Sequence, residues 1–287
     1  MHSTMENLNE LILAVKAKKE LRNLDDEFVK EKINEFFEKN KKVKTKYEES
    51  KSFKEFSRSQ EYNALLKTIR SELREIYGVF ILDKKDERIN LLLKLEKKPL
   101  LDNYNKMLSL HKSTKERLPY YPEIYEKIWP ITGEPKTILD IACGLNPFSY
   151  PYLKIKPKYI ATELASDDCL FLEEYFKRLK IDGVSLAFDL LGKNALAMLK
   201  SLKADVCFLF KTLDSLETIE RDISEKIIKA INCKWLVISF PTVSLGGKKS
   251  IKQERRIWLE RILEKMKLKY EKFAVSNEVF YVMEKAG

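Results

Sequence analysis

One stretch of the chain, Thr137–Pro147, joins an apolar, β-prone run to a turn of small residues. The run contains Asp140 near its end, the turn contains Gly144, and a helix could begin at Asn146. Small residues let a ligand approach the backbone, and glycine tolerates dihedral angles that other residues avoid. The pattern therefore predicts a strand end that binds a nucleotide-like ligand, although a lone glycine turn can also serve only to pack a helix on a sheet.

Four more β-rich apolar runs follow, separated by segments with helical character. They span residues 158–163, 184–188, 205–210 and 235–240. Strands that are apolar throughout, alternating with helices, are typical of a parallel sheet covered on both faces. The fold class expected from the residues is therefore α/β, with a mostly parallel, Rossmann-like sheet.

Acidic residues stand at the ends of three successive strands. Glu163 follows the glycine turn by about twenty residues, a spacing that suits a carboxylate accepting hydrogen bonds from ribose hydroxyls. Asp189 and Leu190 pair an acid with an apolar side chain, which suits the amino group and ring face of adenine. Each acid alone is more simply explained as a helix N-cap. Asp140, Glu163 and Asp189 together favour one shared ligand.

The first part of the chain is expected to be helical throughout. Asp25 precedes an apolar stripe at helical spacing within residues 28–37, and a second stripe runs from Glu61 to Tyr77 with Gly78 as a candidate C-cap. We therefore expect a helical N-terminal domain over residues 1–105 and an α/β domain over residues 106–287.

The charge distribution favours a polyanionic partner. The chain carries 54 Lys and Arg against 44 Asp and Glu, a net charge of +10. Residues 39–54 hold seven Lys against two Glu, and residues 244–272 hold ten Lys and Arg against four Glu. Clustered cations bind nucleic acid by releasing counterions from phosphates, while a solvated, solubilising face remains the alternative for either cluster.

Several other classes of protein and site are disfavoured. No apolar run approaches the roughly 20 residues that a membrane span needs, and the first residues lack the layout of a secretory signal. The four cysteines are scattered without a CxxC pair, and there are only two histidines, so no metal site is expected. A reducing, cytoplasmic location fits this cysteine usage.

A polar segment, Leu110–Leu118, precedes the sheet. Ser113 and Glu116 match a capping box, which would be a purely structural role. No structural role is evident from the sequence for His111 or Arg117. Because a guanidinium matches a carboxylate in shape, Arg117 could hold the carboxylate of an amino-acid-like ligand at the first strand end.

Four segments occur in one order along the chain. They are His111–Arg117, Ile138–Pro147, Ile238–Gly247 and Ser276–Tyr281. Together they closely resemble the aminoglycoside-resistance 16S ribosomal RNA methyltransferases, which transfer a methyl group from S-adenosylmethionine to guanine N7 in the decoding centre of the small ribosomal subunit. The resemblance covers residues 105–285 well and the helical part only loosely. Glu163 stands where family members often have Asp, and Ser149–Lys158 does not match closely.

The resemblance implies a class I methyltransferase sheet that ends in an antiparallel hairpin, here over residues 269–275 and 279–283. It implies an enzyme that binds S-adenosyl-L-methionine and methylates guanine N7 (the nucleotide 1405 type), conferring or mimicking aminoglycoside resistance. The expected partners are the small subunit and its 16S rRNA, with no membrane and a monomeric protein. The helical domain would then dock on the ribosome. The cofactor-binding residues expected on this basis are His111, Ser113, Arg117, Asp140, Cys143, Gly144, Glu163, Leu164, Asp189, Leu190, Leu209 and Lys211.

Catalysis of this kind needs positioning rather than a catalytic residue. Guanine N7 has an in-plane lone pair and no proton near neutral pH, so its attack on a sulfonium methyl group needs no general base. We expect the loop after the fifth strand to hold the flipped guanine, with Phe240, Pro241, Ser244 and Lys248 near the base. For Phe240, a buried strand-end position is an equally good interpretation.

Two other functions remain open on the residues alone. The chain could methylate another RNA site or a small molecule, although a small-molecule enzyme would not need two basic clusters. An Asn/Asp-Pro-Pro-aromatic motif is absent after the fourth strand, which disfavours methylation of an adenine amino group. The chain could also be a non-catalytic ribosome-binding module that retained a cofactor pocket. The intact cofactor acids disfavour this second function, and calorimetry of S-adenosylmethionine binding would test it.

Overall fold

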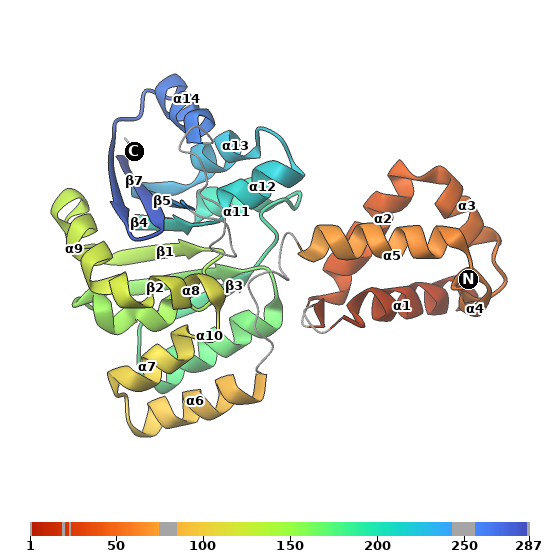
Figure 1. The fold of residues 1–287 in the computed structure, drawn as a ribbon, viewed down its shortest axis with the longest axis horizontal. Helices are drawn as coiled ribbons and strands as arrows, with labels where there is room; N and C mark the ends of the chain where they lie inside the picture. The colour runs from red at the N-terminus through yellow and green to blue at the C-terminus, as the bar shows by residue number, and fades with distance from the viewer. Residues whose placement is uncertain (1, 19–20, 23, 75–84, 243–255, 286–287) are drawn as a thin grey trace. The chain divides into compact units, whose positions relative to one another are not determined.

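The computed structural model describes residues 2–18, 21–22, 24–74, 85–242 and 256–285. The chain forms two compact units (Figure 1). The first comprises Met1–Asp83 with Ala165–Asp167, and the second comprises Lys84–Leu164 with Asp168–Gly287. Each unit has its own buried core and is described separately. No helix among the described residues is long and apolar enough to cross a membrane.

The first unit is helical. Its helices are α1 (His2–Lys16), α2 (Asp26–Lys39), α3 (Lys41–Glu49), α4 (Phe53–Phe56) and α5 (Gln60–Leu73). The two expected apolar stripes are buried, on α2 through residues such as Ile33 and on α5 through residues such as Ile69. Ser59 caps α5 by accepting a 3.0 Å hydrogen bond from the Tyr62 N–H. The expected C-cap at Gly78 lies outside the described residues.

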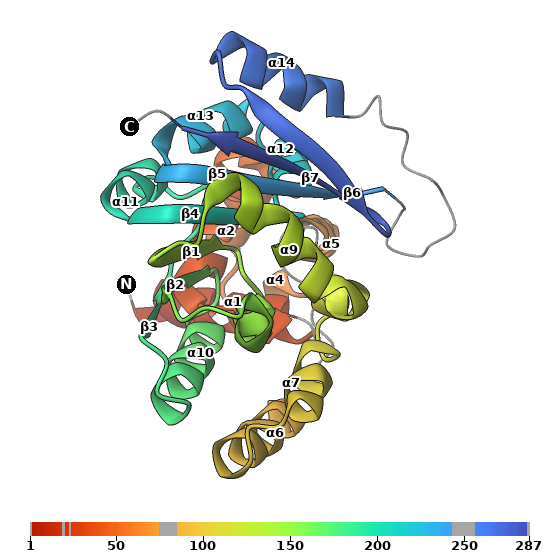
Figure 2. The ribbon, with the colours of Figure 1, turned by 90° about the vertical axis from the view of Figure 1, so that its left-hand side faces the viewer.

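The second unit is built on a seven-stranded sheet of order β3-β2-β1-β4-β5-β7-β6, seen in Figure 2. Strands β1 to β5 are parallel, β7 runs antiparallel to β5, and β6 runs antiparallel to β7. This arrangement confirms the expected α/β class and its C-terminal hairpin. The strands are β1 (Thr137–Ile141), β2 (Lys158–Glu163), β3 (Gly183–Ala187), β4 (Lys203–Phe210), β5 (Asn232–Pro241), β6 (Tyr270–Val275) and β7 (Glu278–Glu284).

Helices cover both faces of this sheet. Side chains of β1 alternate between the two cores, with Ile138 in one and Leu139 in the other, because successive residues of a strand point to opposite faces. The Ile138 side is covered by α6 (Lys85–Lys97), α7 (Leu101–Leu108), α9 (Tyr121–Thr132) and α10 (Ser166–Arg178). The Leu139 side is covered by α11 (Ala195–Ser201), α12 (Leu213–Ile219), α13 (Ile223–Ala230) and α14 (Ile257–Lys265).

Helices α6 and α7 belong to the core of the second unit. Leu91, Leu92 and Leu95 of α6 are buried in the same cluster as Tyr104 and Met107 of α7 and the sheet residues. The compact units therefore divide between Asp83 and Lys84. The boundary expected at residues 105/106 placed α6 and the first residues of α7 in the N-terminal domain, because a helical pattern does not specify the core into which a helix packs.

Candidate functional site

The expected acids lie at one edge of the sheet. The parallel strands β1 and β2 end beside each other, and Asp140 lies in β1 while Glu163 is the last residue of β2. The strand order reverses between β1 and β4, and Lys211 directly follows β4. Ligands of open α/β sheets bind beyond the carboxyl ends of the strands at this kind of reversal. The topology thus brings together residues that are up to 71 positions apart, from Asp140 to Lys211.

Asp140 is buried and holds the turn that follows β1. Its carboxylate accepts hydrogen bonds from the Asn146 side-chain amide at 2.8 Å and from the Tyr159 hydroxyl at 2.6 Å. Burial raises the pKa of Asp140 to about 6, while these two donors and Arg117 act to lower it. In the structure Asp140 therefore acts on the turn through its neighbours, and its contact with a cofactor stays a prediction.

The turn requires glycine at position 144. Gly144 has φ +54°, and a Cβ atom built there would lie 3.0 Å from the His111 ring. The Gly144 N–H donates a 2.5 Å hydrogen bond to Glu163, whose carboxylate also accepts one from the Leu164 N–H at 3.0 Å. Burial and the neighbouring Asp168 raise the pKa of Glu163 to about 7. The turn and the expected ribose acid are therefore directly linked.

His111 immediately precedes α8 (Lys112–Arg117). Burial, with the cations Arg88, Arg117 and Lys211, lowers the pKa of His111 to about 3, so its imidazole is neutral at physiological pH.

The expected Ser113–Glu116 capping box is not formed. The helix begins at Lys112, so Ser113 lies inside its first turn, and the N-cap residue His111 makes no side-chain capping bond. Thr114 instead donates to the carbonyl oxygens of Leu108 and His111, at 2.5 and 3.0 Å. Glu116 pairs with Lys211 at 3.0 Å. The residues have the spacing of the motif, but the helix starts two residues too early for Ser113 to be its N-cap.

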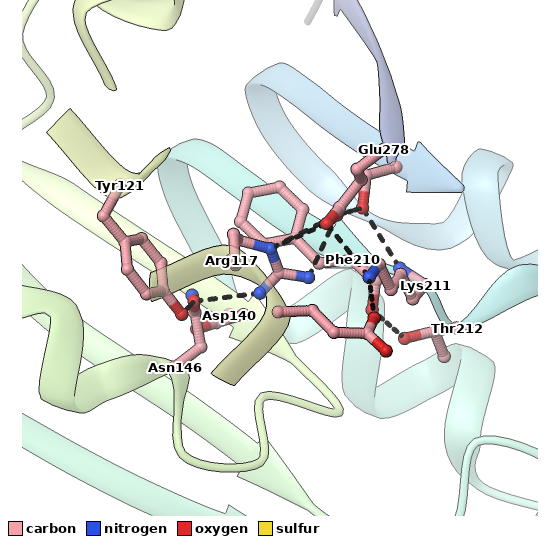
Figure 3. Close-up of polar contacts among 10 residues, drawn as sticks. Arg117, Tyr121, Asp140, Asn146, Phe210, Lys211, Thr212 and Glu278 are labelled. Carbon is pink, nitrogen blue, oxygen red and sulfur yellow. Dashed lines mark hydrogen bonds and ion pairs between the residues drawn. The ribbon is translucent and has the colours of Figure 1, made fainter. Parts of the chain in front are cut away.

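A buried ionic cluster connects α8, β4 and β7 (Figure 3). Arg117 donates to Glu278 from Nε at 3.1 Å and from Nη2 at 3.0 Å, and Lys211 Nζ lies 3.3 Å from the same carboxylate. Ser239 donates a further bond of 2.5 Å. Burial alone would raise the pKa of Glu278, but Arg117 and Lys211 hold it below its usual value. One buried carboxylate thus orients both cations at the carboxyl ends of the strands.

Arg117 also connects this cluster to the turn after β1. Its Nη1 lies 3.3 Å from the Asn146 amide oxygen, which accepts a second bond from Tyr121 at 2.8 Å, and its guanidinium lies over the Phe210 ring at 4.8 Å. No binding or ion-pair role was evident from the sequence for Glu278, Asn146 or Tyr121. A charged residue at the start of the apolar run of β7 was the available signal for Glu278.

The remaining expected cofactor residues differ in their accessibility. Asp189 follows β3 and accepts a 2.9 Å hydrogen bond from the Leu191 N–H. Leu164 is partly exposed, whereas Cys143 and Leu190 are nearly buried. Leu209 is fully buried in the core on the Leu139 face of the sheet. Their roles toward a cofactor stay predictions.

The residues expected near the target base lie at the end of β5. Phe240 is fully buried, with edge-to-face ring contacts at 5.9 Å to Trp258 and 6.0 Å to Tyr281. This environment matches the buried strand-end interpretation of Phe240 rather than base stacking. The Pro241 carbonyl oxygen accepts a 2.7 Å bond from Arg256. Ser244 and Lys248 lie outside the described residues.

The described residues contain no group of three or more His, Cys, Asp or Glu side chains that could hold a metal ion. The polar groups at the carboxyl ends of the strands are instead arranged as ion pairs and hydrogen bonds around the Gly144 turn. This arrangement can bind and orient a polar organic ligand.

Comparison with known proteins identifies the family. The ribosomal RNA methyltransferase (FmrO) family matches residues 53–282. The 16S rRNA (guanine(1405)-N(7))-methyltransferase of Micromonospora rosea is 30% identical over 239 residues, which cover 80% of this chain and 85% of that protein. The enzyme of the same name from Micromonospora echinospora is 29% identical over 230 residues, covering 77% of this chain and 82% of that protein.

Solved structures show the same fold. The 16S rRNA methyltransferase RmtF, in complex with S-adenosyl-L-homocysteine, matches with a TM-score of 0.78 and 24% identity over 98% of this chain and 99% of its own. The 16S rRNA methylase RmtB matches with a TM-score of 0.71 and 21% identity over 97% and 98% of the two chains. Since the family match spans most of the sequence, this chain belongs to the ribosomal RNA methyltransferase (FmrO) family.

Proposed function

We propose that this enzyme transfers the methyl group of S-adenosyl-L-methionine to N7 of a guanine of the nucleotide 1405 type in 16S rRNA. The substrate would be the small ribosomal subunit in the cytoplasm, the enzyme would act as a monomer, and the modification would confer aminoglycoside resistance. The observation that carries the proposal is the Gly144 turn, hydrogen-bonded to Glu163 at the point where the strand order reverses.

The residues present fit S-adenosylmethionine. Gly144 has a left-handed φ and allows the His111 ring to pack directly against the turn, where a Cβ atom would lie 3.0 Å from the ring. Glu163 would accept the ribose hydroxyls, and Asp189 with Leu190 would hold the adenine. Arg117 and Lys211, oriented by Glu278, would face the methionine carboxylate. When bound, the cofactor supplies an electrophilic methyl group on a cationic sulfur.

The protein would act on the reaction by positioning. Guanine N7 attacks without losing a proton, so the chain needs to align the base with the methyl group and to keep water out. The neutral imidazole of His111 adds no positive charge beside a cationic sulfur. The buried carboxylate of Asp140 is held by two fixed donors and would place negative charge at the same end of the sheet.

The test is methylation of small ribosomal subunits with labelled cofactor, followed by mapping of the modified nucleotide. We expect one labelled N7-methylguanine in the decoding centre, and little label on naked 16S rRNA, because separated basic clusters favour a shaped surface. A labelled nucleotide elsewhere, or label on an exocyclic amino group, would contradict the assigned substrate. Failure of the cofactor to bind would contradict the assigned reaction.

A further inference from the structure

Arg88 of α6 is connected to the Gly144 turn through Asp168 and Glu163. Its Nη1 donates a 2.7 Å hydrogen bond to Asp168 at the start of α10. Asp168 is an electrostatic neighbour of Glu163, and Glu163 accepts the Gly144 N–H. Gly144 faces the His111 ring, whose pKa is lowered in part by Arg88 itself. A helix that precedes the sheet by about forty residues therefore contributes a side chain to the expected cofactor site.

The environment of Arg88 is unusual for a cation. The residue is 7% exposed, its guanidinium lies over the Phe171 ring at 5.7 Å, and its Nε has no hydrogen-bond partner among the described residues. Burying a guanidinium with an unsatisfied donor is costly. An arginine that served only to link α6 to α10 would not need to be buried with an unsatisfied donor. A second ion pair between these helices, from Arg178 to Glu96 at 2.7 Å, lies near the surface.

We propose that Arg88 is a positioning residue for the cofactor. By pairing with Asp168 it favours the ionised form of Glu163, which accepts hydrogen bonds from the ribose hydroxyls. This inference rests on the proposed function, because it assigns the ligand of Glu163 as S-adenosylmethionine.

The charges around Glu163 explain why Arg88 is needed. The thiols of Cys143 and Cys169 face Glu163 with pKa values raised by burial, and His111 has a pKa of about 3, so all three are neutral near pH 7. Asp140 and Asp168 carry negative charge and both raise the pKa of Glu163, which with burial reaches about 7. Arg88 forms an ion pair with Asp168 and so offsets the one of these two charges that raises the pKa of Glu163 more.

Removing the Arg88 cation should raise the pKa of Glu163. Without Arg88, the charge on Asp168 is offset less and acts more strongly on Glu163, so the pKa of Glu163 should rise above 7 and less carboxylate should be present at neutral pH. A further rise on the order of one unit would leave about one tenth of Glu163 ionised at pH 7 and most of it ionised at pH 9. Cofactor binding should therefore weaken at neutral pH and recover in alkali.

The experiment compares Arg88→Gln, Arg88→Lys and the double variant Arg88→Gln/Asp168→Asn in the full-length protein. Affinity for S-adenosylmethionine is measured by calorimetry between pH 6 and 9. The pKa of Glu163 is followed by carbon-13 NMR in the cofactor-free protein, assigned with Glu163→Gln. Arg178→Gln is the matched control, because it breaks the other α6–α10 ion pair away from the turn.

We expect Arg88→Gln to weaken binding about fivefold at pH 7 and not measurably at pH 9, with an upward shift of the Glu163 pKa. Arg88→Lys and the double variant should restore both readouts, and Arg178→Gln should change neither. An equal loss at every pH, an unmoved Glu163 pKa or an additive loss in the double variant would overturn the role of Arg88. Absence of binding by the unsubstituted protein would overturn the proposed function itself.

Discussion

Folding favours the neutral form of Glu163, whereas binding of a ribose needs its charged form. Burial is the main cause that raises the pKa of Glu163 from its ordinary 4.5 to about 7, so between these pH values the folded state holds a proton that the unfolded state has released. The contribution of this group to stability is therefore largest at low pH and is lost as pH rises through 7. Binding of ribose hydroxyls requires the opposite, charged form.

Replacing Glu163 should separate the two effects. Glu163→Gln should stabilise the fold at pH 8 by about 1 kcal/mol, with no gain at pH 5, because a neutral amide avoids the cost of a buried charge. Glu163→Ala should weaken binding of S-adenosylmethionine by about 1.5–3 kcal/mol for each hydrogen bond lost. Thermal unfolding at both pH values and calorimetry measure these effects. Glu123→Gln, on the exposed side of α9, should change neither.

Among the residues that the structure describes, Glu278 should contribute more to stability than any exposed carboxylate. It is the shared partner of two buried cations, so Glu278→Gln leaves Arg117 without its carboxylate partner and Lys211 with Glu116 alone. We expect a loss of about 3–5 kcal/mol in the free energy of unfolding, measured by urea denaturation. Ser239→Ala, which removes one donor from the same carboxylate, should cost only about 1 kcal/mol. Equal effects of the two changes would contradict the central place of Glu278.

At the scale of single elements, the turn after β1 depends on the absence of a side chain. Gly144→Ala forces a left-handed φ of +54° on alanine and brings its Cβ to 3.0 Å from the His111 ring. The change should destabilise the protein by roughly 1–3 kcal/mol and weaken cofactor binding, since either the turn backbone or the His111 ring must shift. The matched control is Gly133→Ala at the end of α9, where φ is +71° but nothing lies within 4 Å of the added atom. Gly133→Ala should destabilise the protein without changing its affinity for the cofactor. Equal losses of affinity in the two variants would contradict the importance of the close approach of His111 to position 144.

Most of the strands and helices could be predicted from the sequence. The expected strands at residues 158–163 and 235–240 correspond to Lys158–Glu163 and Asn232–Pro241, because strands buried on both faces stand out as continuous apolar runs. The partners of the site residues were not readable. Glu278 lies 161 positions from Arg117, and Asp168 lies 80 positions from Arg88. No local pattern encodes a contact over such separations, which only the packing of the elements creates.

At the scale of the whole molecule, the boundary between the two compact units lies earlier in the chain than the boundary expected from the helical pattern. The helices before Asp83 have their own core, including Leu11, Val29 and Ile69, and carry the basic segment 39–54. Helix α6 contributes Leu91, Leu92 and Leu95 to the core of the sheet unit. Docking on ribosomal RNA is thus expected of residues 1–83, and cofactor binding of everything from Lys84 onward.

Two truncations test this division. Deleting residues 1–83 should leave a folded protein that binds S-adenosylmethionine within about twofold of the full chain, while methylation of small subunits is lost because the basic segment no longer neutralises phosphates. Deleting residues 1–100 also removes α6, and with it three buried leucines and Arg88, so this protein should unfold at lower urea and bind the cofactor poorly. Near-ultraviolet circular dichroism and calorimetry distinguish the two. Full subunit methylation by a folded protein lacking residues 1–83 would refute docking by the first unit, and equal stability of both truncations would show that α6 is dispensable to the core of the second.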